Sequence, residues 1–569
     1  MTTIFRWGGW LACTAAWVAV LPALAGAAEP AAGEAWRYRI SRGDTLIAIA
    51  AQYMEPGRGW QRLQALNQVA DPLHLVPGSS LKIPIAWLRR TATLAELVFV
   101  QGEVSVQANA SAPSLAVEAG ASLRAGSVIR TGSGASATLR FADGSRLLLT
   151  GDSQVALEQL LVYGRSGIPG IRLRLDLGGG ESNVVPNTGR QRGYEIRTPA
   201  VNLGVRGTQF RTRVAEDGKA TSVEVLQGRV GAGAPRVAAG AARGGPASRE
   251  ATGETPIDAG FGSVAQAGQP IAAARLIGAP DLGATAQRIE RLPLHFEWQP
   301  VAGATGYRAQ VFAEGDTAAL LLDGRFDEPA ARWPDLPDGR YRLRVRGVDE
   351  RRLEGLDAEA GFVLKARPEA PFTSRPSAAA SLHGAAVQFE WTQAAASASY
   401  RLQVAPAGDF ATPVVDRSGI GETSITLPLA PGRYEWRLAS VTADGDQGPF
   451  GDPQGFTLSA EPPDPALQPP EPAPDGLLLR WRAPQPGRTV QIQIASDPAF
   501  EHIVIDQRST EGQALLPRPE PGRYYLRARS IEADGFAGDF GGVQQIDVAK
   551  PPISKWWLLA PAGLLWLLL

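Results

Sequence analysis

Apolar positions between residues 37 and 84 change their spacing along the chain, which predicts a small unit of mixed structure. Tyr38 and Ile40 alternate as in a short strand, and a Gly-Asp-Thr turn follows them. Asp44 or Thr45 of this turn can cap a following helix by accepting its free backbone N–H groups. The helix is predicted because apolar residues then recur at the spacing of one helix face; they are Leu46, Ile49, Ala50 and Tyr53.

A second helix is predicted over Trp60 to Asn67, with Leu63 and Leu66 facing the first helix. The Pro77-Gly78 pair then turns the chain into a closing strand, Leu81 to Ile83. The pattern therefore predicts a compact βααβ unit within residues 36–85.

From residue 95 to residue 231 the pattern becomes alternating strands separated by turns. The stretch 139–149 reads LRFADGSRLLL, with alternating apolar positions on both sides of an Asp-Gly turn, which is a strong hairpin signal. Farther along, alternating Leu173, Leu175 and Leu177 predict a sheet that is wet on one face.

Residues 232–288 interrupt this pattern, because they are rich in Gly, Ala and Pro and have almost no aromatic side chains. A segment of this composition cannot bury enough apolar surface to order itself. We therefore expect a flexible spacer over 232–288.

A period of about 90 residues fills most of the remaining chain. Trp298, Trp391 and Trp481 lie 93 and 90 residues apart, and 43 residues after each comes the Tyr of a Gly-Arg-Tyr tripeptide. Alternating strands follow every Trp and every tripeptide, with arginines at many outward positions. The period predicts three antiparallel β-sandwiches, in which the Tyr packs at a sheet edge and bonds its hydroxyl to backbone. We interpret these repeats as a stalk, over 289–366, 375–459 and 468–549.

The opening unit resembles the LysM family. The resemblance is carried by Y-x-I-x-x-G-D-T-L-x-x-I-A from Tyr38, by Asp71-Pro72, and by L-V-P-G-x-x-L-x-I-P ending at Pro84. It implies binding of N-acetylglucosamine-containing glycans, chiefly peptidoglycan, in a groove between two loops. The implied glycan-binding residues are Gly43, Asp44, Thr45 and Leu46 of the first loop, and Asn67, Leu75, Pro77 and Gly78 of the second.

The chemistry of an acetamido sugar suits such a groove, because backbone groups and a small apolar pocket satisfy it without any charge. Gly43 allows close approach of the backbone, and Leu46 and Leu75 are candidates to contact the methyl group. Leu46 fits a core position equally well, and Asp44 fits either a helix cap or a ligand contact. His74 stands alone in an apolar-flanked loop and is weak evidence for a metal or catalytic site.

The second region resembles the FecR domain. Its markers include Thr131-Gly132, Asp143-Gly144-Ser145, Thr198-Pro199 and Val205-Arg206-Gly207-Thr208. The family implies the periplasmic part of a sensor that relays a signal from an outer-membrane receptor to a sigma factor. Only a signal-like segment and the LysM-like unit precede it here, so we expect a binding or assembly module. Arg206, Gly207 and Thr208 are candidates for partner contact, although a structural turn with Gly207 at positive φ is favoured.

The three repeats resemble fibronectin type III or related immunoglobulin-like domains. The predicted fold class is therefore mainly β and multidomain: a small βααβ LysM-like head, a β-rich FecR-like domain and three tandem β-sandwiches.

The two ends of the chain are apolar. Arg6 is the only charge in the first 28 residues, and an apolar run ends in small residues, which predicts an export signal over 1–28, with a membrane anchor as the alternative. Cys13 is the only cysteine and lies within the predicted export signal. Cleavage of that signal would therefore leave a mature chain without disulfides or Cys-based chemistry. Residues 553–569 form a hydrophobic tail, interpreted as a membrane anchor or processed sorting signal, with a docked strand or helix as the alternative.

Composition and motifs exclude further classes. The chain has 56 Lys and Arg against 57 Asp and Glu, so no basic surplus supports nucleic-acid binding. Common nucleotide-binding and hydrolase motifs are absent from the sequence. Its four histidines, which fall in separate modules, are His74, His295, His383 and His502. We therefore expect neither enzymatic activity nor a cofactor or metal.

Three functional hypotheses follow. The first is an exported, non-enzymatic protein of the periplasm or cell envelope that binds peptidoglycan, with its β modules as a partner-contacting scaffold. The second is a FecR-type signal-input protein that regulates a membrane partner or a sigma-factor pathway. The third is a hydrolase whose carboxylate pair comes from distant strands. Membrane attachment through the C-terminal tail is an additional expectation.

Overall fold

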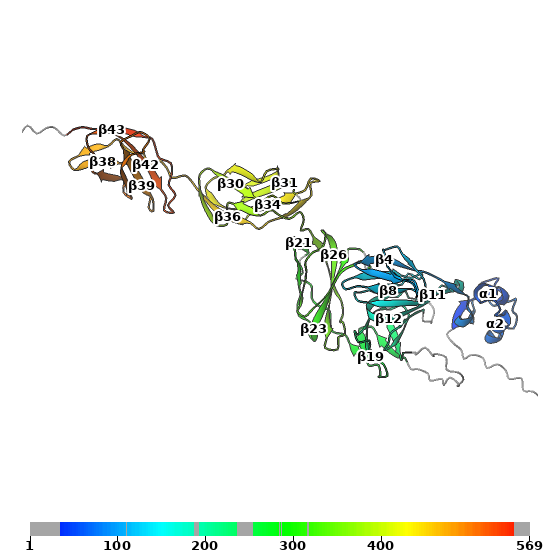
Figure 1. Ribbon diagram of the computed structural model, residues 1–569. Coiled ribbons are helices and arrows are strands. Elements are labelled where there is room, and N and C mark those ends of the chain that lie inside the picture. The colour runs from blue at the N-terminus through cyan, green and yellow to red at the C-terminus, as the bar shows by residue number, and fades with distance from the viewer. Residues whose placement is uncertain are drawn as a thin grey trace, which may run out of the picture. The chain divides into compact units, whose positions relative to one another are not determined.

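The computed structural model describes residues 35–550, apart from 110, 187–192, 236–253, 284, 286, 316–317 and 396 (Figure 1). Its contacts divide the chain into two compact units, one ending at Leu364 and one beginning at Lys365. The predicted export signal over 1–28 and the predicted tail over 553–569 lie outside the described residues. In the part of the chain that is described, no helix combines the length and the apolar character needed to cross a bilayer.

The N-terminal module is the predicted βααβ unit. It consists of β1 (Ala35–Arg39), α1 (Leu46–Tyr53), α2 (Trp60–Asn67), β2 (Ser80–Pro84) and a short 3-10 helix, η1 (Ile85–Trp87). The two strands pair antiparallel, and Leu46, Ile49 and Leu63 are buried in one core. Leu66 was predicted to face α1 but is 37% exposed, because the short α2 buries only Leu63.

The strands of the central module are hydrogen-bonded into a closed barrel, and its strands belong to two sheets. Its strands are β3 (Arg90–Ala92), β4 (Ala95–Gln101), β5 (Val104–Gln107), β6 (Ser114–Ala116), β7 (Ser122–Leu123), β8 (Val128–Thr131), β9 (Ser136–Arg140), β10 (Arg146–Leu149), β11 (Gln154–Tyr163), β12 (Ile168–Asn183), β13 (Tyr194–Arg197), β14 (Asn202–Val205), β15 (Gln209–Val214), β16 (Ala220–Gln227), β17 (Arg229–Gly233), β18 (Thr255–Asp258), β19 (Phe261–Gln266) and β20 (Ala274–Arg275), with a 3-10 helix η2 (Gly164–Ser166).

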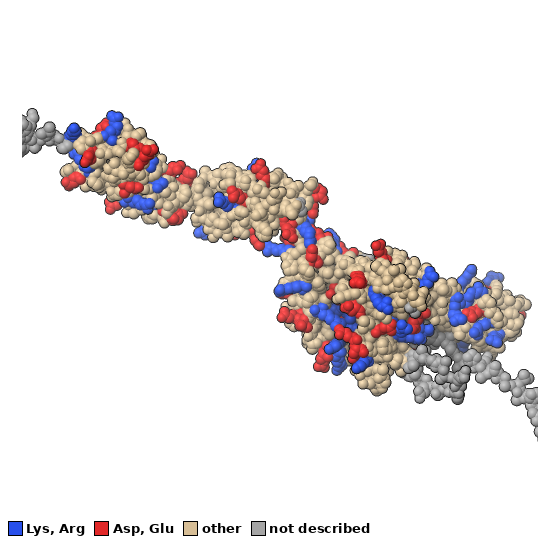
Figure 2. Space-filling model, in the orientation of Figure 1, with Lys and Arg blue, Asp and Glu red and all other residues tan. Residues whose placement is uncertain are grey.

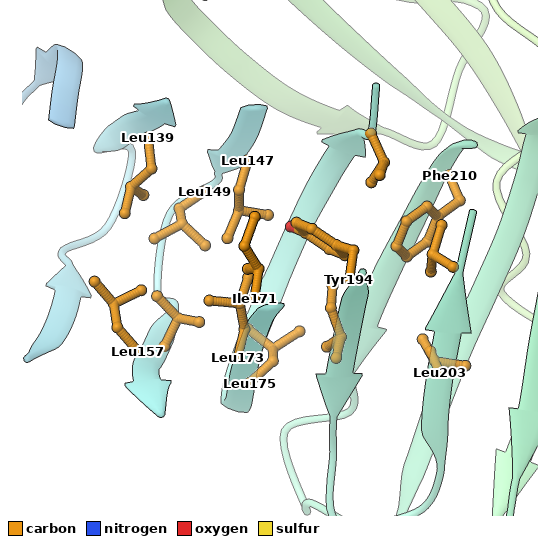
Figure 3. Close-up of a cluster of buried hydrophobic side chains, with 14 of the residues drawn as sticks. Leu139, Leu147, Leu149, Leu157, Ile171, Leu173, Leu175, Tyr194, Leu203 and Phe210 are labelled. Carbon is orange, nitrogen blue, oxygen red and sulfur yellow. The ribbon is translucent and has the colours of Figure 1, made fainter. Parts of the chain in front are cut away.

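The core of the central module lies between its two sheet faces. Leucines from β9, β10, β11 and β12 point toward one another, and Tyr194 and Phe210 continue the cluster (Figure 3). Strands β9 and β10 pair as the predicted hairpin, with Gly144 of the turn at a φ of +86°.

Strand β12 belongs to both sheets. Up to Leu177 it pairs with β11 and β13, and from Gly178 onward it pairs with β10 and β15. Gly178 has a φ of +74°, and a Cβ at this position would collide with Asp152 and Ser153. Leu173 is buried as predicted, whereas Leu177 is 41% exposed because the strand leaves the first sheet there.

Part of the predicted spacer is folded, so the expectation of flexibility over 232–288 was wrong for residues 255–275. Strand β18 pairs with β17, β19 pairs with β16, and β20 pairs with β19. Ile257 and Ala265 enter the core of the central module. The low average hydrophobicity of the whole segment concealed these short alternating stretches.

The first repeat contains the two predicted sheets. Strands β21, β27, β26, β23 and β24 form the larger sheet, and β22 pairs with β25. Their bounds are β21 (Arg288–Ile289), β22 (Leu294–Glu297), β23 (Ala304–Ala313), β24 (Leu320–Phe326), β25 (Ala330–Trp333), β26 (Gly339–Asp349) and β27 (Ala358–Leu364).

The second and third repeats lie in the C-terminal unit and are also two-sheet structures. The second contains β28 (Thr373–Arg375), β29 (Ala380–His383), β30 (Ala386–Trp391), β31 (Ser399–Pro406), β32 (Val415–Ile420), β33 (Ser424–Pro428), β34 (Gly432–Val441), β35 (Gln447–Phe450) and β36 (Gln454–Ser459). The third contains β37 (Glu471–Ala473), β38 (Gly476–Arg480), β39 (Thr489–Ala495), β40 (Ile503–Ser509), β41 (Gln513–Leu516), β42 (Gly522–Ile531) and β43 (Gln544–Val548).

Every repeat buries its Trp and fastens its Tyr as predicted. The three Trp side chains, at 298, 391 and 481, are 4–5% exposed. The hydroxyls of Tyr341, Tyr434 and Tyr524 each donate to the carbonyl four residues earlier, at 2.6, 2.8 and 3.0 Å. The repeated tripeptide is thus part of the sandwich framework.

Candidate functional site

Two loops of the N-terminal module lie side by side where the groove was predicted. The Leu46 amide donates to the Pro72 carbonyl, and the Gly78 amide donates to the Ile40 carbonyl, both at 2.8 Å. These bonds tie the loop that begins at Gly43 to the loop over 67–78. Gly43 and Gly78 have φ values of +90° and +84°, which an L side chain rarely adopts.

Polar side chains of the first loop hold the loop itself. Thr45 caps α1, because its Oγ1 accepts from the Ala48 amide at 3.1 Å. The Asp44 carboxylate accepts from the Tyr38 hydroxyl and from the Ser41 amide, both at 2.7 Å. Partial burial and the bond to Asp44 raise the pKa of Tyr38 to about 12. Thr45 is therefore the helix cap, and Asp44 stiffens the loop beside it.

Two other predicted ligand residues are occupied within the fold. Leu46 is fully buried in the core. Of its two predicted roles, it therefore occupies the core position. The Asn67 side chain bridges α2 and β2: it accepts from the Lys82 amide at 2.7 Å and donates to the Lys82 carbonyl at 2.8 Å. Leu46 is thus part of the core, and the half-buried Asn67 side chain ties α2 to β2 beside the loops.

The exposed surface of the second loop is partly apolar. Leu75 is half-buried against the core, and Pro77 is exposed. Leu73 and Val76, which the sequence interpretation did not single out, are 56% and 70% exposed. The sequence contained a signal for these two residues, because both are apolar and lie in the loop over 67–78. Apolar side chains exposed together mark contact surfaces.

The Arg206-Gly207-Thr208 segment is a tight turn between β14 and β15. Gly207 has a φ of +70°, and a Cβ there would collide with Pro186. Thr208 is 2% exposed, and its Oγ1 donates to the Arg229 carbonyl at 3.0 Å. The contacts support the turn interpretation, and only Arg206 of the three is exposed.

A second site, which sequence reasoning missed, lies between the central module and the first repeat. Ser136 Oγ donates to the Leu320 carbonyl at 2.8 Å, and Thr138 Oγ1 donates to the Ala318 carbonyl at 2.7 Å. Leu148, Phe312 and Leu320 form a buried apolar cluster beside these bonds. We call this contact region the joint.

Charged side chains dominate the joint. Arg346 is fully buried and binds Glu354 at 2.6 Å, Glu181 at 2.8 Å and Asp357 at 3.1 Å. Arg344 binds Glu181 from the same strand at 2.9 Å. Burial opposes ionisation of Glu181, but Arg346 and Arg344 outweigh it and lower its pKa to about 2.

The arginines of the first repeat were predicted to point outward as part of a stalk. Arg308, Arg344 and Arg346 are instead 4%, 6% and 0% exposed. They do leave the sandwich core, as alternation requires, but a face of the central module covers them. The stalk interpretation is therefore wrong for the first repeat, which folds against the central module within one unit.

The sequence contained a signal for this difference. In the second and third repeats the arginine three residues after the tripeptide Tyr is stacked between two Phe rings, at centroid distances of 3.9–4.3 Å. One of those rings, Phe450 or Phe540, lies 16 residues after that Tyr. The first repeat has Asp357 at this position, and Asp357 bonds Arg346 and Arg211 of the joint.

Glu224 differs from Glu181 of the same joint, because its pKa is raised and not lowered. It lies on β16 and is 1% exposed, and its Oε1 accepts from the Glu354 amide at 3.3 Å. Burial and the nearby Glu354 carboxylate raise its pKa to about 7, against an ordinary 4.5. The folded joint therefore binds a proton at Glu224 more tightly than the unfolded chain does.

This pKa predicts that the joint weakens as pH rises. Glu224 should contribute up to about 3 kcal/mol to the free energy of unfolding at pH 4.5 and lose this contribution as pH rises past 7. Denaturation of the full chain at several pH values, followed by hydrogen exchange of joint peptides, measures the change. Glu224→Gln should flatten the dependence of the free energy of unfolding on pH. Glu195→Gln, on the other sheet of the central module, should leave that dependence unchanged. An equally steep profile in Glu224→Gln would contradict the assignment.

Comparison with known families agrees with both N-terminal modules. Residues 38–84 match the model of the LysM domain, and residues 127–231 match the model described as FecR protein. These matches confirm the two family resemblances. The LysM module points to glycan binding and the FecR module to envelope signalling, and both families are non-catalytic. Such domains are typical of extracellular or envelope proteins.

Similarity to whole proteins is slight. No curated protein matches the chain. Among solved structures, the FN1–FN3 domains of chicken CNTN1 match at 13% identity, over 45% of this chain and 94% of that chain, with a TM-score of 0.22. A putative anti-sigma factor from Parabacteroides distasonis matches at 14% identity, over 26% of this chain and 59% of that chain, with a TM-score of 0.19. Fibronectin(III)-like modules of Clostridium thermocellum CbhA match at 10% identity, over 31% of this chain and 93% of that chain, with a TM-score of 0.20. At TM-scores this low, these likenesses do not bear on function.

The described part of the chain contains no candidate metal site. There, no group of three or more His, Cys, Asp or Glu side chains is placed to hold a metal ion. His74 bonds Asp71 at 2.8 Å on the surface of the LysM module.

Proposed function

We propose that the protein is a non-enzymatic component of the cell envelope that binds peptidoglycan through its LysM module. The FecR module and the sandwiches serve as a scaffold that contacts other envelope components. The bound chemistry is that of N-acetylglucosamine, whose acetamido group is satisfied by main-chain polar groups and a small apolar surface.

The observation that carries this proposal is the LysM match over 38–84 together with the pairing of its two loops. The Leu46–Pro72 backbone bond holds the loops together, and Gly43 keeps one loop free of a side chain. Leu73 and Val76 supply exposed apolar surface on the other loop. Sedimentation of the purified chain with clean peptidoglycan sacculi tests the proposal directly, and a chain that stays in the supernatant contradicts it.

Gly43→Val should weaken sacculus binding about tenfold. A β-branched residue at a φ of +90° costs about 1–2 kcal/mol, and the loop relieves this strain by changing the shape of the groove. A factor of ten corresponds to about 1.4 kcal/mol of binding free energy. The affinity is measured by depletion of the chain from solution over a series of sacculus concentrations.

Gly57→Val is the matched control for this variant. Gly57 has a φ of +88° with open space around it, but it lies in the turn between the two helices. Its replacement introduces the same backbone strain away from the groove and should leave binding unchanged. Arg206→Ala, in the FecR module, should also leave binding unchanged. Loss of binding in either control would mean that the groove is misplaced.

A second candidate function is signal input to a membrane partner or sigma-factor pathway. The FecR match over 127–231 favours it. Because the first repeat folds against the FecR module, residues 90–364 should be removed as one block. A deletion that changes envelope-responsive transcription while sparing sacculus binding would favour signalling over a purely structural role.

We place the protein in the periplasm or cell envelope, in keeping with the two families. Attachment to a membrane through residues 553–569 is the remaining part of this proposal. Fractionation of cells that express the chain with and without these residues tests it, and equal distribution of the two forms would contradict it.

A further inference from the structure

The LysM module is strongly basic although the chain as a whole is not. Residues 35–90 contain eight Lys and Arg against three Asp and Glu, whereas the full chain has a net charge of −1. Figure 2 shows Lys and Arg side chains gathered on the visible face of this module. The surplus therefore belongs to one module and not to the protein in general.

Several of these cations share one exposed sheet face. Arg37 and Lys82 are directly opposite each other in the register of β1 and β2, and Arg39 lies two residues along β1 from Arg37. All three are exposed. Like charges directly opposite each other on a sheet are destabilising, so folding alone does not explain their placement.

The carboxylates of the module are engaged elsewhere. Asp44 bonds Tyr38, Asp71 bonds His74, and Glu55 binds Arg90 at 2.9 Å. In the described part of the chain, no carboxylate lies within ion-pair distance of the other seven cations of the module: Arg37, Arg39, Arg42, Arg58, Arg62, Lys82 and Arg89. Among the described residues, the basic face thus has no counter-charge.

This face borders the groove. Arg39 pairs with Ser80 in the sheet, and Ser80 follows the loop that ends at Gly78. The Ile40 carbonyl accepts from the Gly78 amide, and Arg42 directly precedes Gly43. A polymer held in the groove would therefore pass beside Arg39 and Arg42, and its charged branches could reach Lys82 and Arg37.

We propose that the LysM module selects carboxylate-bearing wall glycan over neutral glycan, through the basic face of β1 and β2. This inference rests on the proposed peptidoglycan binding and deepens it. Peptidoglycan carries free carboxylates on its peptide branches, whereas a plain N-acetylglucosamine polymer carries none. The groove holds the sugar, and the basic face holds the acidic branches.

The test compares binding of the full chain to native sacculi and to sacculi whose carboxylates have been chemically amidated. The native chain should bind native sacculi at least about tenfold more tightly at about 0.1 M salt, where the screening length is about 10 Å. The preference should shrink at about 1 M salt, where that length is about 3 Å. Equal binding to both preparations overturns the proposal while leaving peptidoglycan binding intact; binding to neither overturns both.

Variants assign the effect to the basic face. Arg37→Glu with Lys82→Glu should remove the preference for native sacculi and leave binding to amidated sacculi unchanged. Arg417→Glu with Arg433→Glu, at exposed positions of the second repeat, makes the same change in net charge and should keep the preference. Loss of binding to both preparations in the first variant overturns the proposal. A second outcome also overturns the proposal: the native chain binds phosphatidylglycerol vesicles, and the variant loses this binding but keeps the preference for native sacculi. The basic face would then bind a membrane surface.

Discussion

Arg346→Ala will lower the free energy of unfolding of the unit that ends at Leu364 by about 3–5 kcal/mol. The guanidinium of Arg346 is fully buried and meets three carboxylates, those of Glu181, Glu354 and Asp357. Removing it leaves these charges buried without their partner, and that penalty exceeds the worth of the ion pairs themselves. Hydrogen exchange measured across a denaturant series gives the free energy peptide by peptide.

The peptides that respond should include β12 as well as β26, because Glu181 belongs to the FecR module. Arg529→Ala is the matched control. Arg529 lies five residues after the tripeptide Tyr of the third repeat, as Arg346 does in the first. It is half-exposed and stacks on Phe540 at a centroid distance of 4.4 Å. Its loss should cost about 1 kcal/mol. Equal costs at the two positions would show that the joint contributes nothing specific.

Gly178→Ala will destabilise the FecR module by about 3 kcal/mol or more. The residue has a φ of +74°, where a Cβ costs about 1–2 kcal/mol. The added methyl would also meet the backbone of Asp152 and Ser153, and overpacking of this kind costs about 1–3 kcal/mol. Chemical denaturation with hydrogen exchange of β11 and β12 peptides measures the sum.

Gly218→Ala separates the two contributions. Gly218 has a φ of +68°, close to that of Gly178, but a Cβ there meets nothing within 4 Å. This variant should show only the backbone cost of about 1–2 kcal/mol. If both variants cost the same, the close packing at the point where β12 changes sheets is not what requires glycine.

The elements that could be predicted are those whose signal is local. The helix over 60–67 and the hairpin over 136–149 follow from spacing and turn residues within a few positions of each other. The Trp and Tyr periods predicted the sandwiches, because their buried indoles and hydroxyl bonds repeat in every copy. At the groove, Gly43 and Gly78 were named from the LysM resemblance, and both have the positive φ values that favour glycine.

The elements that could not be predicted depend on contacts between distant segments. Strands β18 and β19 lie in a stretch whose average composition is that of a linker, and only their partners β17 and β16 order them. Leu46 matches both a ligand position and a core position, and packing decides between them. Arg346 follows the outward alternation of its strand, but alternation does not say whether the outward side meets water or another module.

The joint has a practical consequence for dissecting this protein. A fragment that stops at residue 231, where the FecR match ends, would lack β18 and β19 and would uncover Glu181, Arg211 and Glu224. Those side chains would then face solvent beside an exposed Leu148, on a sheet with an open strand edge at β16, which invites self-association. The smallest soluble piece that contains the FecR module therefore extends to Leu364, and truncations chosen from family boundaries alone will aggregate.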